Sequence, residues 1–214
     1  MIAPSPKRIR LKTKLQPTQA RAQDTYEVIL ATAGEMLRDR GFEQLTTNAI
    51  CKRAGITPPA LYRYFPNKYA ILKELGDRLM AAQDEEMLGW IAAGGLTGAR
   101  FDERLASIVA IQRRMTEITR AFPGGVAIGR ALRAVPMLQA LRFASRDMVA
   151  AGLAAAIAPV HPQVDPARLG VATRMLVELG YAATEMMVEE PDRDIDMLTI
   201  EVCRMLVLYF DSLG

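Results

Sequence analysis

The stretch TTNAICKRAGITPPALYRYF, residues 46–65, has the punctuation of two short helices joined by a tight turn. Thr46 or Thr47 can cap the first helix, because a threonine hydroxyl accepts a hydrogen bond from an unpaired N–H of the opening turn. Gly55 ends that helix, since glycine enters the left-handed conformation without a Cβ penalty. Thr57 is expected to cap the second helix, and the two prolines after it fall where N–H groups have no intrahelical partner. The stretch predicts a helix-turn-helix, whose second helix can enter a DNA major groove.

The charge around this motif is unevenly distributed. Residues 1–80 carry 14 Lys and Arg against 7 Asp and Glu, a net of +7, whereas residues 81–214 carry 13 against 17, a net of −4. A basic head on an acidic body is typical of a protein that binds a polyanion. Residues 1–16 are predicted to be a flexible basic arm that follows phosphates or reaches a minor groove. The alternative for these residues is a solubilising tail.

The composition also argues against several other classes of protein. Half of the 214 residues are apolar, but no run approaches the roughly 18 uncharged apolar residues of a membrane span, and no apolar segment follows the N-terminal charges. We therefore expect a cytoplasmic protein without a membrane partner. Cys51 and Cys203 stand too far apart in sequence to indicate a disulfide framework or a metal site. His161 is the only histidine, so no serine has a histidine base nearby, and we expect no catalytic residue, metal or cofactor.

Apolar residues at helical spacing, interrupted by proline and glycine, predict helices along the rest of the chain. The expected helices lie at about 17–40, 68–90, 101–121, 126–134, 136–158, 166–188 and 194–213. The predicted fold class is all-α. We expect a three-helix DNA-binding domain at residues 17–66, joined by a long helix to a helical ligand-binding and dimerisation domain at residues 67–214.

The motif belongs to a longer pattern, Thr47-x-x-Ile50-x-x-x-Ala54-Gly55-Ile56-Thr57-x-x-x-Leu61-Tyr62-x-Tyr64-Phe65-x-x-Lys68-x-x-x-Leu72. This pattern resembles the tetracycline-repressor (TetR) family of bacterial transcription regulators, over roughly residues 20–72. The resemblance implies a homodimer in which residues 58–65 enter the major groove and the C-terminal domain holds a small-molecule pocket. It also implies that the last two long helices form a four-helix bundle with their mates, and that an inducer moves the helix beginning at Lys68 and releases an operator.

Two positions depart from the family pattern. Cys51 stands where a small residue, commonly alanine, is usual, and Pro59-Ala60 replaces a glycine-threonine pair. The second change removes a hydroxyl that could contact DNA, so operator specificity does not transfer from the family. For Cys51 an oxidation sensor and a small buried residue are both open, and we favour the buried residue.

Resemblance and physical chemistry together assign roles on double-stranded DNA. Tyr62, Lys68 and Thr47 are predicted phosphate contacts, which position a protein without reading sequence. Lys52 is either a further phosphate contact or part of a solvated face. Base readout is expected from Thr57, Pro58, Ala60 and Arg63. Of these, Arg63 can pair with guanine, whereas alanine and proline can only touch a thymine methyl group.

The second domain contains flexible thioethers and aromatic rings, which suit a cavity for an apolar small-molecule effector. The candidate ligand contacts are Trp90, Met115, Phe122, Met137, Phe143, Met148, Met175 and Tyr181. Each of these residues is also interpretable as plain core. Arg113, Arg114, Arg130 and Arg133 either favour an anionic ligand or face solvent.

The last two helices have more apolar surface than the end of a monomer normally exposes. The candidate dimer contacts are Leu176, Leu179, Met186, Val202, Met205 and Phe210. A symmetric dimer would match a palindromic site. We therefore expect a ligand-responsive dimeric regulator, most naturally a repressor released by a small hydrophobic inducer. The alternative is a small-molecule or lipid-binding helical protein whose basic head contacts an acidic partner or membrane, and an enzyme ranks third.

Overall fold

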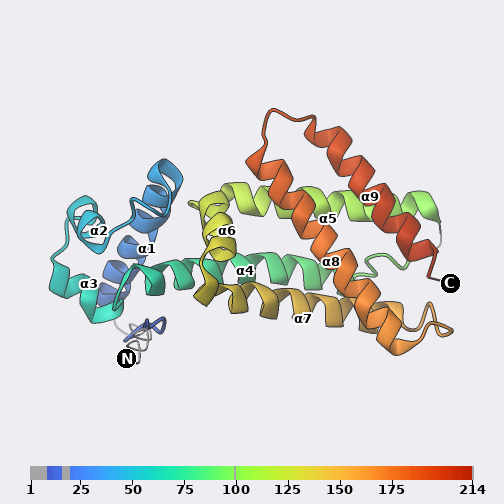
Figure 1. Cartoon of the computed structure of the whole chain (residues 1–214), viewed down its shortest axis with the longest axis horizontal. Coiled ribbons are helices and arrows are strands. Elements are labelled where there is room, and N and C mark those ends of the chain that lie inside the picture. Colours follow the sequence, from blue (N-terminus) through green and yellow to red (C-terminus); the bar gives the residue numbers. More distant parts are fainter. Residues whose placement is uncertain (1–8, 16–19, 99, 214) are drawn as a thin grey trace, which may run out of the picture. The chain divides into compact units, whose positions relative to one another are not determined.

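The computed structural model describes residues 9–15, 20–98 and 100–213, and it confirms the predicted all-α class (Figure 1). The elements in chain order are α1 (Ala20–Arg40), α2 (Thr47–Ala54), α3 (Pro58–Tyr64), α4 (Lys68–Ala92), α5 (Phe101–Ala121), α6 (Gly125–Ala134), the 3-10 turn η1 (Pro136–Leu138), α7 (Gln139–Ile157), α8 (Pro166–Glu189) and α9 (Ile195–Asp211). The helix expected from Pro136 begins as a 3-10 turn, which is common at helix N-termini. Its regular part starts at Gln139.

Packing divides the chain into two compact units. The first contains residues 1–78 together with 123–131, and the second contains residues 79–122 together with 132–214. Both units draw on α4, since Arg78 is the last residue of the first segment. These units follow packing rather than function, so the functional boundary expected at residue 66 stays a prediction.

The first unit is built around aromatic side chains between α1 and the end of α3. The ring of Tyr26 stacks on Phe65 at a centroid distance of 4.8 Å and meets Tyr64 edge-on at 5.7 Å. Leu61 and Ile50 are fully buried beside them. Tyr64 and Phe65 therefore pack the end of α3 against α1.

The ends of the two motif helices show which of the expected caps form. The hydroxyl oxygen of Thr46 accepts a hydrogen bond from the Ala49 N–H at 3.1 Å, and Gly55 ends α2 in the left-handed region, with φ of 66°. Thr57 occupies the N-cap position of α3, but its side chain makes no capping hydrogen bond. One reason is that a proline follows at N2, and the N–H of Ala60 already donates to the Thr57 carbonyl at 3.0 Å. The expected side-chain cap at Thr57 is therefore wrong.

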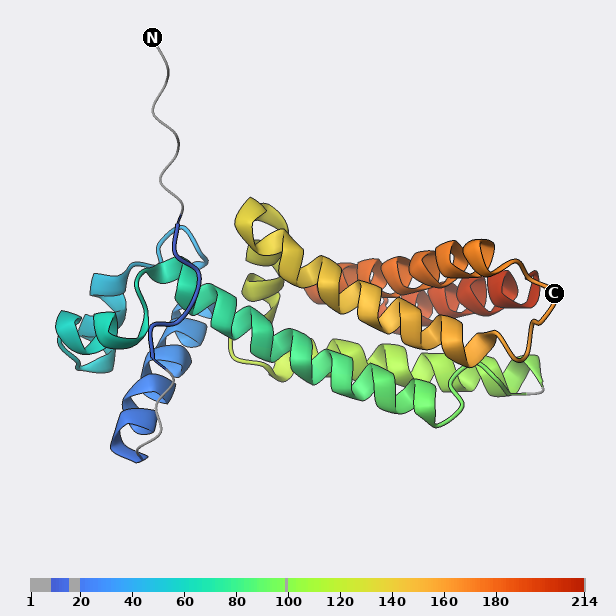
Figure 2. The same cartoon turned by 90° about the horizontal axis from the view of Figure 1, so that it is seen from below.

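The second unit is a helical bundle in which α8 packs against α5, α7 and α9 (Figure 2). Its hydrophobic core is formed by buried side chains between Ile91 on α4 and Leu213 after α9. Thr173, Thr184 and Thr199 are buried inside this bundle, and their hydroxyl groups donate to carbonyl oxygens four residues earlier in the same helix. These local bonds satisfy polar groups that burial would otherwise leave unpaired.

Candidate functional site

The helix α3 presents its predicted reading residues on its outer side. Tyr62 and Arg63 are exposed, as are Thr57 and Pro58, whereas Ala60 is half-buried. The opposite face of α3 is fixed in the core by Leu61 and Tyr64. The arginine has a guanidinium group 5.8 Å from the ring centroid of its neighbour Tyr64. An exposed arginine on a short, anchored helix is what guanine recognition in a major groove requires.

The predicted phosphate contacts Thr47 and Tyr62 lie together. Their hydroxyl oxygens are 3.0 Å apart, which joins the first residue of α2 to the exposed face of α3. Lys52 is exposed on α2. The adjacent Arg53 instead pairs with Glu35 at 2.9 Å and Asp39 at 3.0 Å, so it holds α2 against α1.

Lys68 is positioned before any ligand arrives. Its ammonium group donates to the carbonyl oxygen of Phe42 at 3.3 Å and lies 4.2 Å from the ring centroid of the same residue. An ammonium group has three donors, and the bond to Phe42 uses one of them. The first residue of α4 therefore has donor capacity for a phosphate at the N-terminus of that helix.

The basic arm contributes contacts that spacing alone did not reveal. The backbone N–H of Lys14 donates to the Tyr64 carbonyl at 2.8 Å, and its ammonium group donates to the Tyr62 carbonyl at 3.0 Å. The side-chain amide of Asn67 donates to the Arg10 carbonyl at 2.8 Å. Residues 9–15 are thus bound to the C-terminal end of α3, while residues 1–8 and 16 of the expected arm lie outside the described residues. The clustering of basic residues was a signal for DNA, but no spacing rule predicted this docking.

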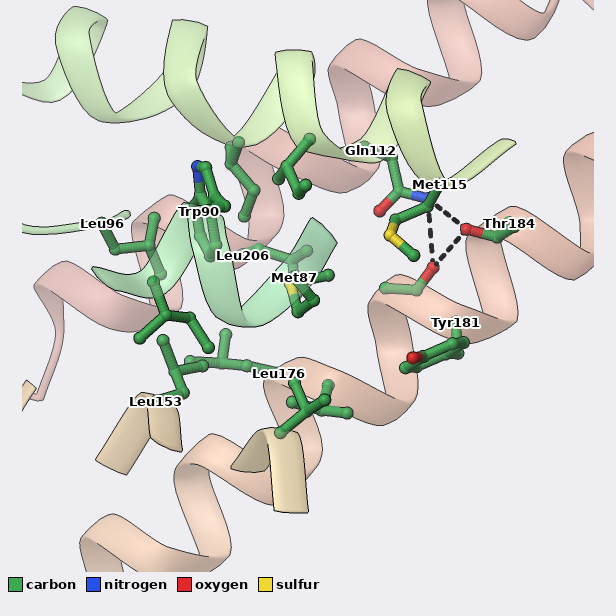
Figure 3. Close-up of a pocket in the computed structure, with 16 residues that line it drawn as sticks. Met87, Trp90, Leu96, Gln112, Met115, Leu153, Leu176, Tyr181, Thr184 and Leu206 are labelled. Carbon is green, nitrogen blue, oxygen red and sulfur yellow. Dashed lines mark hydrogen bonds between the residues drawn. The ribbon is translucent and has the colours of Figure 1, made fainter. Parts of the chain in front are cut away.

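The second unit contains a cavity between α4, α5, α7, α8 and α9 (Figure 3). The open volume of this cavity is about 50 Å³. The predicted ligand contacts Trp90, Met115 and Tyr181 line it. The lining also includes Met87, Ile91, Leu96, Ile108, Ile111, Gln112, Val149, Leu153, Leu176, Val177, Gly180, Thr184 and Leu206.

Five predicted ligand contacts lie elsewhere. Phe143, Met148 and Met175 are exposed, and Phe122 and Met137 are half-buried outside the cavity lining. A helix of mixed apolar residues does not reveal which side faces a cavity, so the choice among thioethers and rings could not be made from sequence. Their role as ligand contacts stays a prediction.

Most of the cavity wall is apolar, and its polar groups are few. The side-chain amide of Gln112 donates to the Thr184 hydroxyl at 2.8 Å and to the Gly180 carbonyl at 3.1 Å (Figure 3). The indole N–H of Trp90 donates to the Ser107 hydroxyl at 2.9 Å. An apolar wall with a small number of fixed polar groups is typical of small-molecule sites.

The helices α8 and α9 share a face of exposed apolar side chains, here called the α8/α9 apolar face. It consists of Val171, Met175, Leu179, Met186, Met197, Ile200, Met205, Leu208 and Tyr209. Three predicted dimer contacts, Leu179, Met186 and Met205, belong to this face, and Val202 is half-buried. Leu176 and Phe210 are instead buried within the chain, Leu176 against the cavity and Phe210 under the His161 ring at 4.8 Å.

Both cysteines are free and buried. Burial raises the pKa of the Cys51 thiol, and it raises the pKa of the Cys203 thiol to about 12. A raised pKa lowers the fraction of reactive thiolate, which favours the packing role for Cys51 over a sensing role. Across residues 9–15, 20–98 and 100–213, no three His, Cys, Asp or Glu side chains gather as a metal site, and no helix has the length and apolarity to cross a bilayer.

An exposed arginine on the anchored second helix of a two-helix motif is typical of a helix-turn-helix DNA-binding protein. Residues 29–75 match the family described as "Bacterial regulatory proteins, tetR family". This match covers the helix-turn-helix and the start of α4, and it supports a TetR-type transcriptional regulator.

The sequence similarity between this chain and known proteins lies mainly in the first unit. The chain is 43% identical over 54 residues to the tetracycline repressor protein class C of Escherichia coli, which is 25% of either chain. It is 43% identical over 61 residues to the HTH-type transcriptional regulator EthR of Mycobacterium tuberculosis, 28% of either chain. The aligned part thus spans about a quarter of the length of these curated relatives. The structure of SmeT, the repressor of the Stenotrophomonas maltophilia multidrug efflux pump SmeDEF, matches with a TM-score of 0.66 at 19% identity, over 87% of this chain and 90% of that one. At this identity the match shows the fold alone.

Proposed function

We propose that the protein is a dimeric, ligand-responsive repressor that binds a palindromic operator and is released by a small hydrophobic inducer. The observation that carries the DNA-binding part is the exposed Arg63 on a helix anchored by the buried Leu61 and Tyr64. Around it, the Thr47–Tyr62 hydroxyl pair and the positioned Lys68 supply backbone contacts. These residues divide the work into base readout and phosphate positioning.

The cavity of the second unit supports the ligand-responsive part. It is enclosed mainly by apolar side chains, but its open volume of about 50 Å³ is smaller than the range of about 300–1,000 Å³ found for small-molecule sites. The narrow open space inside it means that a ligand must displace side chains. Met87 and Met115 line the cavity, and flexible thioethers can change rotamer at modest cost. An occupied cavity therefore differs in packing from an empty one, which gives an effector a means to favour one conformation.

The α8/α9 apolar face supports the dimer. Val171 is 65% exposed and Met197 is 63% exposed, and such side chains recur along both helices. An apolar face of this extent is typical of an interface between protein chains. A two-fold dimer would present two copies of α3, and their symmetry would match an inverted repeat in DNA.

Selection from a random duplex pool tests the proposal. The purified full-length protein is incubated with the pool at two salt concentrations, and the bound duplexes are sequenced. We expect an inverted repeat with half-sites about one helical turn, or a multiple of it, apart, and an affinity that falls steeply with salt. Enrichment of no sequence, or tighter binding to anionic lipid vesicles than to any duplex, would contradict the proposal and favour the lipid-binding alternative.

A further inference from the structure

Two buried polar residues outside the cavity lining, Asp84 and Ser145, lie one helical turn before residues that line it. On α4, Asp84 precedes the cavity-lining Met87 and Ile91 at intervals of three and seven, so it lies on the same side of the helix one turn earlier. On α7, Ser145 stands one turn before Val149, which also lines the cavity. The apolar stripes of two helices thus end in a carboxyl group and a hydroxyl group at the same end of the cavity.

These two groups meet. The hydroxyl of Ser145 donates to Oδ1 of Asp84 at 2.6 Å, although the two residues are 61 positions apart. Asp84 is 8% exposed and Ser145 is 5% exposed. Burial raises the pKa of the Asp84 carboxyl, and the bond from Ser145 opposes that rise. In the described part of the chain Asp84 has no ion-pair partner, so its charge is buried without compensation.

Tyr181 on α8 lies at the same end of the cavity, near Asp84. Its side chain lines the cavity (Figure 3), and its buried hydroxyl lies near Ser145 but makes no hydrogen bond of good geometry in the described structure. Burial first, and the charge of Asp84 second, raise the pKa of Tyr181 to about 12, while the neighbouring Ser145 lowers it. The phenol therefore keeps its proton at neutral pH. A buried polar group without a partner costs free energy, which a ligand could relieve.

The positive charge that lies against the Tyr181 ring is already engaged in ion pairs. The guanidinium of Arg146 lies 4.8 Å from the ring centroid of Tyr181, but it pairs with Glu178 and with Glu185. Glu178 in turn pairs with Arg174, and Glu185 pairs with Arg133. These three arginines therefore pair with glutamates rather than with Asp84, while Arg142, which acts on Arg146, has a buried Nε without a hydrogen-bond partner among the described residues.

Two other arginines considered for an anionic ligand are also in ion pairs. Arg113 pairs with Asp196 at 2.9 Å, and Arg114 pairs with Glu86 at 3.1 Å. Arg133 belongs to the network around Glu185. These pairings do not supply the free cation that an anionic ligand would need.

We propose that the cavity binds apolar molecules carrying a protonated amine, with the ammonium group held by Asp84 beside Tyr181 and the apolar body among the aliphatic and thioether side chains. This inference rests on the proposed role of the cavity as the effector site. An ammonium group donates charge-assisted hydrogen bonds to a carboxylate, and it is attracted to the face of an aromatic ring. It would also compensate the buried carboxylate, whereas a carboxylate head group would be repelled.

Three probes of equal chain length test the charge preference: decylamine, which is protonated at pH 7, 1-decanol and sodium decanoate. Each is titrated into the full-length protein without DNA, below its aggregation concentration, by calorimetry. Trp90 is the only tryptophan in the chain and lines the cavity, so its fluorescence reports independently on occupancy. We expect decylamine to bind at least about tenfold more tightly than the other two, as a charged hydrogen bond provides. Equal or tighter binding of decanoate, or binding of none of the three, would overturn the inference.

Variants test which residue causes the preference for the amine. Asp84→Asn keeps an oxygen that can accept the bond from Ser145 but removes the charge, so decylamine should lose about tenfold in affinity while 1-decanol changes little. Glu85→Gln is the matched control, because it removes an exposed carboxylate from the next position of α4. Tyr181→Phe should weaken decylamine less than Asp84→Asn does. An amine preference that survives Asp84→Asn would show that the head group lies elsewhere. Since no DNA is present, failure here leaves the duplex selection to decide the proposed function.

Discussion

A Cβ atom on Gly124 would lie 2.4 Å from the carbonyl oxygen of Gly34, because the turn before α6 lies directly on α1. A Cβ on Gly34 would in turn lie 2.8 Å from the carbonyl oxygen of Pro123. Gly124 also has φ of 74°, in the left-handed region. All three residues belong to the first unit, so this close contact attaches residues 123–131 to the helix that supports the DNA-binding motif.

Gly124→Ala is expected to destabilise the first unit by at least about 2 kcal/mol, since it adds left-handed strain to a backbone clash that no rotamer change can relieve. The measurement is denaturant unfolding of the full-length protein. Gly129→Ala in the following helix α6 is the control, because a Cβ there would meet nothing within 4 Å, and it should be neutral or stabilising by up to about 1 kcal/mol. Equal stability of the two variants would contradict the close contact.

The helix ends could be predicted from the sequence, whereas the contact made by this turn could not. Proline and glycine marked nearly every helix end, because they act on local backbone conformation. The break before α6 was therefore predictable from Pro123 and its two following glycines. That Gly124 meets Gly34, 90 positions away, was not predictable, because it depends on the path of α5 between them.

The same limit applies to the candidate sites. The reading face of α3 was predictable because the motif fixes which positions of that helix are buried. The cavity was predicted only in part, since apolar residues recur on several sides of the long helices and Met148 and Met175 are exposed. Asp84 was missed altogether, because one carboxyl group among the five acidic residues of α4 has no sequence signature of burial.

Arg63→Ala and Lys68→Ala are expected to affect DNA binding differently. Removing the exposed Arg63 should cost about 1–3 kcal/mol on the preferred duplex and relax preference at one base pair of each half-site. Removing Lys68 should weaken binding to all duplexes alike and reduce the salt dependence, because the contact is to a phosphate. Binding isotherms on preferred and scrambled duplexes at several salt concentrations separate these outcomes.

Lys73→Ala is the matched control for the lysine, since Lys73 lies further along α4 and pairs with Asp77 at 2.6 Å. Its loss should leave DNA affinity nearly unchanged. Thermal unfolding of each variant excludes a general loss of structure, which matters for Lys68 because of its contacts with Phe42. Loss of affinity in the same sequence-independent way for Arg63→Ala and Lys68→Ala would refute the division between base readout and phosphate positioning.

Met205→Glu is expected to abolish dimerisation. Met205 is 61% exposed on the α8/α9 apolar face, and a carboxylate buried in an interface at this face would be a charge without a partner. Sedimentation velocity should show a dimer for the unmodified protein and a monomer for the variant. Val160→Glu makes the same type of change at an exposed apolar side chain outside this face, and it should remain dimeric. A dimeric Met205→Glu would place the interface elsewhere.

Asp84→Asn is expected to stabilise the protein at neutral pH in the absence of ligand. Because burial raises the folded-state pKa of Asp84 above its usual value of 3.8, folding is unaffected below that value, where the carboxyl is protonated in both states. As the pH rises through the raised pKa, the folded protein must bury a charge that the unfolded chain leaves in water, so this residue reduces stability. Melting temperatures from about pH 4 to about pH 8 should therefore show a gain for Asp84→Asn that grows with pH, while Glu85→Gln shows no such trend. A gain that is absent or independent of pH would mean that the Asp84 charge is compensated in the folded protein, and would remove the reason for an amine to bind there.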